Sequence, residues 1–155
     1  MAPEHIHTYL TSLGMLSISS DGAVITGVYL PTENLPSLPE GTDLLMNRAA
    51  EEIGEYLSGR RKTFNLPAEQ EGTEFQHQVW HAITAIPYGK TKTYGEIARQ
   101  IGRPGAAQAV GTACGSNRLP LLIPCHRVTA ADGLGRYAGG GQLKLRLLRL
   151  EHDFA

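Results

Sequence analysis

Leu122-Ile123-Pro124-Cys125-His126-Arg127-Val128 is the stretch around which the rest of this 155-residue chain can be interpreted. It sets a cysteine beside a histidine, directly after an apolar run that begins at Leu119 and is interrupted only by Pro120. The run predicts a buried, strand-like segment, and Pro124 favours extended backbone in the residue before it and ends the strand. We therefore expect Cys125 at a sharp turn that leaves the interior, where a thiol beside an imidazole can become a thiolate.

A cysteine beside a histidine is a weak signal on its own, because core cysteines are often inert and histidines are common at surfaces. Cys114 and Cys125 could pair, but nothing else indicates an oxidising compartment, so free thiols are expected. They and the six histidines lack the spacing of zinc ligands, and we expect neither a metal nor a cofactor. The first residues lack the basic-then-apolar pattern of a secretory signal, so none is expected, and no apolar run of roughly 18 residues could span a bilayer.

Charge is distributed unevenly along a chain whose net charge is only −1. Residues 1–71 carry four basic and ten acidic side chains, a net charge of −6, whereas residues 72–155 carry ten basic and five acidic ones, a net charge of +5. Ordinary scatter of surface charge is one explanation, and a surface for a polyanion in the second half is the other. The same division gives the expected domains, an α/β support domain with its linker followed by a mainly α-helical domain.

The first half contains β-prone segments at residues 15–18 and 23–29, separated by the turn signal Ser20-Asp21-Gly22. A helix is expected from about Asp43 to Leu57. The polar stretch from Pro67 to Gly72 is expected to be the linker. No catalytic group of residues stands out in this half of the chain.

The second half contains two capping boxes, Thr73-Glu74-Phe75-Gln76 and Thr93-Tyr94-Gly95-Glu96, and each predicts the start of a helix. A third helix, made almost wholly of small residues, is expected from Pro104 to about Cys114. The second and third helices, joined by a short turn at Gly102, predict a helix-turn-helix. Small side chains would let DNA approach the backbone of the third helix closely, although they would also suit tight packing between helices.

A last helix is expected from about Gly141. Its predicted apolar stripe is formed by Leu143, Leu147, Leu150 and Phe154. Glu151 lies at the edge of this stripe, and an inward carboxylate needs a partner because unpaired burial is costly. His126 is the candidate for that partner.

Pro124-Cys125-His126-Arg127-Val128 resembles the active-site motif of the O6-alkylguanine-DNA alkyltransferases, repair proteins that are consumed by the reaction they perform. The resemblance extends through the second half of the chain, and the motifs together are far more specific than this five-residue motif alone. The matching motifs are Val79-Trp80, Ile86-Pro87-Tyr88-Gly89, Thr93-Tyr94-Gly95-Glu96-Ile97-Ala98, Gly102-Arg103-Pro104-Gly105-Ala106-Ala107, Ala109-Val110-Gly111, Asn117, Gly135-Arg136-Tyr137-Ala138-Gly139-Gly140, and Leu147-Leu148 before Glu151. The first half matches only in length and in its hairpin-then-helix pattern.

This resemblance implies a ribonuclease-H-like α/β domain followed by the helical domain that carries the helix-turn-helix and the cysteine. The implied partner is double-stranded DNA with alkylated bases, in whose minor groove the second helix of the motif docks while the damaged guanine rotates into a pocket. The implied DNA-binding residues are Tyr94, Gly95, Arg103, Ala106, Ala107 and Gln108. Neither a membrane nor an obligate protein partner is implied. We expect a cytoplasmic monomer, associated with the nucleoid in a bacterium, with cooperative assembly along DNA left open.

For the chemistry, the resemblance implies that His126 takes the proton of Cys125 through a water molecule, and that Glu151 stabilises the imidazolium. The thiolate displaces guanine from the alkyl carbon, while Tyr94 donates a hydrogen bond to the leaving base. Asn117 braces the turn at the cysteine. The implied pocket wall is formed by Cys114, Val128, Tyr137 and Ala138. Nothing regenerates the thioether, so one molecule repairs one O6-alkylguanine, with O4-alkylthymine as a further candidate lesion.

Gln108 departs from the family pattern, which has an arginine there to fill the gap left by the flipped base. Glutamine can donate a hydrogen bond to the orphaned base but lacks the cation, so slower repair of duplex DNA is expected. Two alternatives to alkyl transfer stay open. One is an alkyltransferase-like protein that binds lesions without repairing them, although that class lacks the cysteine. The other is a cysteine hydrolase with turnover, which has no use for a helix-turn-helix.

Overall fold

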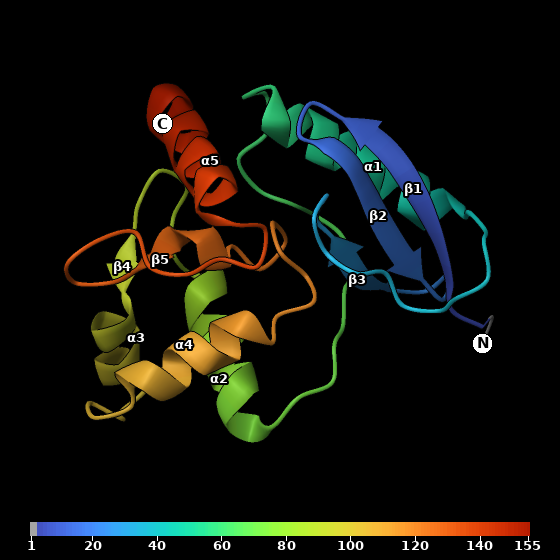
Figure 1. Ribbon diagram of the computed structural model, residues 1–155. Helices are drawn as coiled ribbons and strands as arrows, with labels where there is room; N and C mark the ends of the chain where they lie inside the picture. Colours follow the sequence, from blue (N-terminus) through green and yellow to red (C-terminus); the bar gives the residue numbers. More distant parts are fainter. Residues whose placement is uncertain (1–2) are drawn as a thin grey trace. The chain divides into compact units, whose positions relative to one another are not determined.

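The computed structural model describes residues 3–155 and divides the chain into two compact units, one ending at Gln70 and the other beginning at Glu71 (Figure 1). The expected domain boundary lies one residue later. Each unit buries apolar side chains of its own. Among the described residues, no helix is long and apolar enough to cross a membrane.

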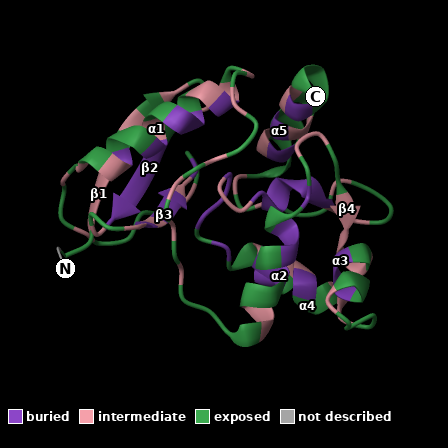
Figure 2. Ribbon diagram, turned by 180° about the vertical axis from the view of Figure 1, so that it is seen from behind, coloured by how far each residue is buried: buried purple, intermediate pink, exposed green. Residues whose placement is uncertain are grey.

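The first unit is a three-stranded antiparallel sheet with one helix packed on it (Figure 1). Its elements are β1 (His5–Thr11), β2 (Gly14–Ser20), β3 (Ile25–Tyr29) and α1 (Leu44–Leu57). The strand order is β1-β2-β3, so β2 is central, and Figure 2 shows β2 buried along most of its length. α1 packs against β2 and β3 and buries Met46, Ala49, Ile53 and Tyr56 in its core-facing stripe.

Local signals explain where these elements begin and end. The predicted helix is confirmed: Asp43 caps it by accepting a 2.8 Å hydrogen bond from the backbone N–H of Met46, and Gly59 follows its end at a φ of 79°. The predicted turn is also present, with the carboxylate of Asp21 accepting from the N–H of Ala23 at 2.9 Å. β1 was not predicted, and most of its residues are only half-buried.

The expected linker from Pro67 to Gly72 begins as part of the first unit. The N–H of Ile25 donates to the carbonyl of Pro67 at 2.8 Å, and the N–H of Glu69 donates to the carbonyl of Ile25 at 3.0 Å. These bonds form a parallel bridge between Ile25 and Ala68. The linker prediction is therefore wrong at its start, because the free edge of β3 binds this polar segment.

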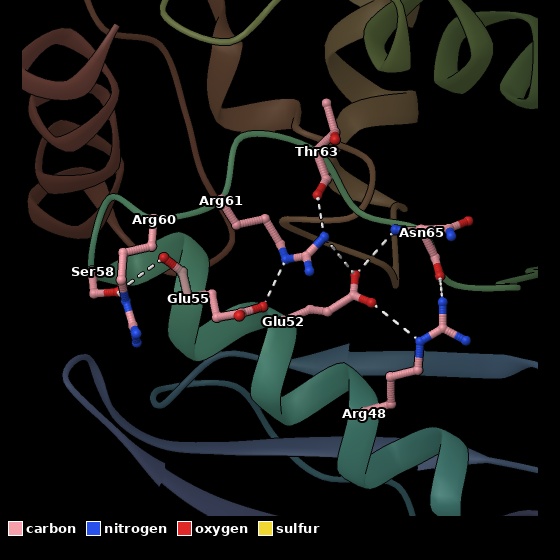
Figure 3. A network of polar contacts seen from close by, with 8 residues as sticks. All are labelled: Arg48, Glu52, Glu55, Ser58, Arg60, Arg61, Thr63 and Asn65. Atoms are coloured by element: carbon pink, nitrogen blue, oxygen red, sulfur yellow. Dashed lines mark hydrogen bonds and ion pairs between the residues drawn. The ribbon is translucent and has the colours of Figure 1, made fainter.

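Glu52 of α1 is a buried carboxylate that fixes the chain following the helix (Figure 3). It accepts from Nε of Arg48 at 3.2 Å and from the N–H of Asn65 at 3.0 Å, and it lies 3.5 Å from Nη1 of Arg61. Arg48 also donates to the carbonyl of Asn65. These charged and backbone partners offset the cost of burying the carboxylate, and they attach the segment around Asn65 to α1.

The second unit is built from helices and one short parallel strand pair (Figure 1). Its elements are α2 (Glu74–Thr84), β4 (Lys92–Thr93), α3 (Tyr94–Gln100), α4 (Ala107–Gly115), the 3-10 helix η1 (Cys125–Arg127), β5 (Val128–Thr129) and α5 (Gly141–Phe154). Helices α2, α3 and α4 contact one another, β4 pairs with β5, and α5 contacts η1. The core includes Val79, Ile83, Ile97, Val110 and Val128.

Both predicted capping boxes are present, at the starts of α2 and α3. Gly102 follows α3 with a φ of 80°. The next helix begins at Ala107, three residues later than predicted. Arg103 to Ala106 form a turn closed by a 2.9 Å hydrogen bond between their backbones, and Pro104 takes the second position of this turn, which its fixed φ suits, rather than the first turn of a helix.

The apolar run from Leu119 to Ile123 is not the strand that its composition predicts. It is a series of turns in which Leu119 and Leu121 are buried, and Leu121 has a φ of 74°. Asn117 provides the hydrogen bonds that a partner strand would otherwise supply: its side-chain carbonyl accepts from the N–H of Leu119 at 2.9 Å, and its amide donates to the carbonyl of Ile123 at 3.0 Å.

Candidate active site

Cys125 is the first residue of η1 and lines a cavity of about 720 Å³. Its exposed fraction is 6 %, so the residue is largely shielded from solvent while it lines this cavity. The cavity is lined by Tyr94, Ala107, Gln108, Gly111, Thr112, Cys114, Gly115, Cys125, Ala130, Gly135, Arg136, Tyr137 and Ala138. All of them belong to the second unit. The site is thus contained in one unit.

Asn117 also contacts the sulfur of Cys125. Its side-chain amide donates to Sγ at 3.4 Å, in addition to the bond that it makes with the carbonyl of Ile123. A donor aimed at sulfur favours the thiolate over the thiol. The side chain that shapes the turn therefore also stabilises the charge on which nucleophilic attack depends.

His126 is fully buried, and its Nε2 lies 2.6 Å from Oε2 of Glu151, so the predicted contact between these residues is present. Burial lowers the pKa of His126, while the hydrogen bond and charge of Glu151 act in the opposite direction. The charges of Arg127 and Lys144 lower this pKa further. The imidazole is therefore neutral at pH 7, in the form that can accept a proton.

Besides His126, the side chain of Arg127 and a backbone N–H donate hydrogen bonds to Glu151. Arg127 donates from Nε to Oε1 at 2.8 Å and from Nη2 to Oε2 at 3.1 Å, and its Nη1 donates to the carbonyl of Ile86 at 2.7 Å. The N–H of Gly89 donates to Oε1 at 3.0 Å. These charge-assisted bonds favour the ionised carboxylate and fix its position, so Glu151 is a stable acceptor for the imidazole.

Tyr94 forms part of the cavity wall, where the glycine-rich loop approaches its hydroxyl. A Cβ at Gly135 would lie 2.7 Å from that oxygen, and Gly135 has a φ of 78°, so the approach requires glycine. Burial raises the pKa of Tyr94, which keeps the phenol protonated and able to donate. Burial also raises the pKa of the Cys114 thiol to about 12, so this second cysteine of the cavity stays protonated.

The predicted DNA-binding residues lie on α3, on α4 and in the turn between them. Arg103 and Gln108 are exposed, whereas Tyr94, Gly95, Ala106 and Ala107 are half-buried. Tyr94, Ala107 and Gln108 also line the cavity, which joins the candidate DNA surface to the thiol.

Val128 differs from the other predicted pocket residues. Cys114, Tyr137 and Ala138 line the cavity, but Val128 is fully buried in the core of the second unit. Successive side chains of a strand point to opposite faces, and on β5 the one that faces the core is Val128. The expectation that its side chain lines the pocket is therefore wrong. The backbone carbonyl of Val128 instead accepts a hydrogen bond from Nζ of Lys144 at 2.6 Å.

Lys144 was not predicted as part of the site. α5 begins at Gly141 as expected, but its buried residues are Lys144, Leu147 and Glu151, while Phe154 is 47 % exposed. Residues at positions i, i+3 and i+7 lie on one helix face. The position of Lys144 on the same helix face as Glu151, already a candidate for burial, was the signal that could have identified this lysine.

A comparison with known protein families identifies the second unit. Residues 74–153 match the family model of the 6-O-methylguanine DNA methyltransferase, DNA binding domain. The methylated-DNA–protein-cysteine methyltransferase of Mycobacterium tuberculosis H37Rv is 40 % identical over 155 residues, covering 97 % of this chain and 94 % of that protein. The inducible methylated-DNA–protein-cysteine methyltransferase of Bacillus subtilis is 50 % identical over 103 residues, covering 66 % of this chain and 58 % of that protein.

Solved structures extend the likeness to both units. The crystal structure of M. tuberculosis OGT in complex with DNA has a TM-score of 0.91 and 38 % sequence identity, covering 97 % of this chain and 94 % of that one. The O6-methylguanine DNA methyltransferase of Methanococcus jannaschii, with 24 % identity and a TM-score of 0.69, shares the fold. With a family model over more than half of its length and a relative of 40 % identity over nearly all of it, this chain belongs to the 6-O-methylguanine DNA methyltransferase family.

Proposed function

We propose that this protein repairs DNA by direct reversal, moving the alkyl group of O6-alkylguanine irreversibly to Cys125. O4-alkylthymine is a further candidate lesion. The observation that carries the proposal is a thiol at the wall of a cavity, with the amide of Asn117 at 3.4 Å from its sulfur and a neighbouring His126–Glu151 pair. The methylated-DNA–protein-cysteine methyltransferases that resemble this chain support it.

Transfer begins with removal of the thiol proton. Because Glu151 binds Nε2 of His126, Nδ1 is the nitrogen that takes this proton from Cys125, through a water molecule. Glu151 stabilises the imidazolium, and Asn117 stabilises the thiolate. The sulfur then forms a bond to the alkyl carbon while the bond from that carbon to O6 breaks, and the electron pair of the broken bond leaves with guanine.

The leaving guanine gains negative charge and needs a donor. Tyr94, whose pKa is raised by burial, keeps its proton and donates a hydrogen bond to the base. The alkylated oxygen is inaccessible within a duplex, so the lesion must rotate out of the stack into the cavity. The volume of about 720 Å³ is of the size that binds small ligands, with Cys114, Tyr137 and Ala138 on the walls.

The DNA surface in this proposal is formed by α3, α4 and the turn between them. The small residues of α4 allow close approach of the duplex, and residues 72–155 carry the net charge of +5 that attracts phosphates. Arg103 and Gln108 are exposed on this surface. The similar fold of OGT in complex with DNA supports DNA as the partner.

The mass of the intact protein after incubation with a methylated-guanine duplex tests the proposal. A gain of one methyl group, mapped to Cys125, is expected, and Cys125→Ser should abolish it. Cys114 is an internal control that should stay unmodified, because its thiol is protonated. Disappearance of lesions while Cys125 remains unmodified would overturn the proposal, and repeated rounds on the same molecule would favour the cysteine hydrolase.

Gln108 is the observation that favours a second candidate, lesion binding without transfer. It is exposed and at the cavity, where an arginine is expected from the family pattern. Gln108→Arg should speed transfer from duplex DNA more than transfer from a single-stranded oligonucleotide, which has no partner base to replace. An unchanged duplex rate would contradict this role. Tight binding to the lesion with no mass gain would identify the second function.

Broader assignments belong to the same proposal. A ribonuclease-H-like first unit with a support role is favoured by its antiparallel strands, its single helix and parallel bridges at Ile6–Glu40 and Ile25–Ala68. We also propose a cytoplasmic monomer, nucleoid-associated in a bacterium, that can assemble cooperatively on DNA. Sedimentation with and without duplex DNA tests the last point, since cooperative assembly would appear only with DNA.

A further inference from the structure

Lys144 of α5 is a fully buried lysine that the mechanism above does not use. Its Nζ donates to the carbonyl of Val128 at 2.6 Å and to the carbonyl of Arg136 at 3.0 Å, and it lies 5.8 Å from the centre of the Tyr94 ring. Lysine is almost never fully buried without partners, because its ammonium group loses hydration. Two carbonyls and an aromatic face replace part of that hydration.

The two carbonyls come from different segments of the site. Val128 follows η1 and lies three residues after the nucleophile Cys125, whereas Arg136 belongs to the glycine-rich loop that lines the cavity. A single ammonium group therefore links the segment that carries the sulfur to the loop that borders the substrate. Loss of this group would loosen the cavity as well as remove a charge.

The buried charges near Cys125 do not balance until the thiol ionises. Arg127 is paired with Glu151 at 2.8 Å, and His126 is neutral. Among the described residues, Lys144 donates to two uncharged carbonyls, so its positive charge is the one left over. A thiolate on Cys125 would supply the matching negative charge.

Several titratable groups on the surrounding elements are near enough to interact electrostatically with this ammonium. They are Cys125 and His126 on η1, Cys114 on α4 and Tyr94 on α3. Burial lowers the pKa of Lys144, and negative charge at either cysteine would raise it. Because burial raises the pKa of the Cys114 thiol to about 12, Cys114 carries no negative charge near neutral pH.

We propose that Lys144 is a positioning residue for alkyl transfer, which holds Val128 and Arg136 around the cavity and whose charge stabilises the thiolate of Cys125. The inference rests on the proposed function and divides the activation of sulfur between two residues. His126 removes the proton, and Lys144 stabilises the anion that remains.

The reaction of Cys125 with iodoacetamide, followed by peptide mass spectrometry over a range of pH and without DNA, tests this role. Lys144→Met keeps the length of the side chain and removes its charge. We expect the pH at which Cys125 reacts at half its maximal rate to rise by about one unit or more. Lys90→Met, which removes an exposed charge from the same unit, is the matched control and should leave that pH unchanged. An unchanged pH in Lys144→Met would overturn the proposal.

Two further variants separate charge from packing. Lys144→Arg keeps the charge and should return the half-reactivity pH toward that of the parent, whereas Lys144→Gln keeps a donor without the charge and should behave like Lys144→Met. Equal shifts in Lys144→Arg and Lys144→Met, in samples shown to be folded by thermal unfolding, would overturn the role of the charge. If Lys144→Met does not fold, the comparison of Lys144→Gln with Lys144→Arg decides.

Iodoacetamide needs neither a lesion nor base flipping, so this test is independent of alkyl transfer. A raised half-reactivity pH in Lys144→Met, together with no methyl transfer by the parent protein, would contradict the proposed function but not the stabilisation of the Cys125 thiolate by Lys144. The reverse result, methyl transfer by the parent and an unchanged half-reactivity pH in Lys144→Met, would contradict the role of Lys144 alone.

Discussion

Glu52 in the first unit and Glu151 in the second are both buried glutamates bound by arginine, yet their surroundings differ. Glu52 pairs with Arg48 and Arg61 (Figure 3). The side chains of these arginines are 49 % and 30 % exposed. Glu151 pairs with Arg127, whose side chain is 8 % exposed, and with a completely buried histidine. Both carboxylates also accept a backbone N–H.

Glu52 and Glu151 differ more in the chemical nature of their partners than in their burial. Arginine keeps its charge at any physiological pH, so the partners of Glu52 can only hold the chain in place. One partner of Glu151 is His126, whose charge can change during a reaction. The partners of Glu151 are also less exposed to solvent than those of Glu52, which strengthens the influence of Glu151 on that charge. A structural ion pair becomes part of a reaction when one of its members can titrate.

Glu151→Gln should have the largest effect, because it keeps the size of the side chain and removes its charge. We expect transfer to slow at least about 100-fold, since carboxylates that orient a catalytic histidine contribute this much or more. Stability should fall by about 3–5 kcal/mol, because buried Arg127 loses its counter-ion. Single-turnover methyl transfer and denaturant unfolding measure the two. A near-parental rate would mean that Glu151 only holds the chain, as Glu52 does.

Glu52→Gln is the matched substitution in the first unit. Because its arginines are partly exposed and its backbone contact can persist, stability should fall by only about 1–2 kcal/mol. Transfer per folded molecule should equal that of the parent, since all residues around the cavity belong to the second unit. Slower transfer by fully folded Glu52→Gln would assign this carboxylate a functional role.

The third prediction concerns His126 of the second unit and the way in which the free energy of unfolding depends on pH. Burial lowers the pKa of His126, so the folded state takes up its proton less readily than the unfolded chain, where the pKa is about 6.5. This group therefore contributes stability above about pH 6.5 that is lost as the pH falls, by up to about 1.4 kcal/mol per pH unit. His126→Gln should remove this part of the slope in urea unfolding between about pH 5 and pH 8. An identical slope in both proteins would contradict a buried neutral imidazole.

Features fixed by neighbouring residues could be predicted from the sequence. Asp43 and the two capping boxes satisfy backbone N–H groups three residues away, so their patterns are visible locally. The contact between His126 and Glu151 spans 25 residues but followed from a single rule, that a carboxylate beside an apolar stripe needs a partner. The same rule applied to Lys144 would have found the second buried charge of α5.

Features that depend on a free sheet edge, or on one side chain outside the apolar pattern, could not be predicted. The bridge between Ile25 and Ala68 depends on which sheet edge is free, and no pattern near Ala68 records that. The apolar run before Cys125 indicated burial correctly, but burial does not specify conformation. The side chain of Asn117 decided that the run forms turns, by binding Leu119 and Ile123.

Arg48→Gln should have the smallest effect, and it tests whether exposure sets the strength of these pairs. The side chain of Arg48 is 49 % exposed, so water screens its attraction to Glu52, which keeps Arg61 and the N–H of Asn65 as partners. We expect a loss of about 0.5 kcal/mol in denaturant unfolding.

The counterpart of this variant is Arg127→Gln, which leaves Glu151 in a dry site without its cation and should cost several times more, about 3–5 kcal/mol. Equal losses would mean that exposure does not set the strength of the two networks. The difference between the two networks would then depend on the titratable histidine alone. A histidine is a partner of Glu151, whereas the described contacts of Glu52 include none.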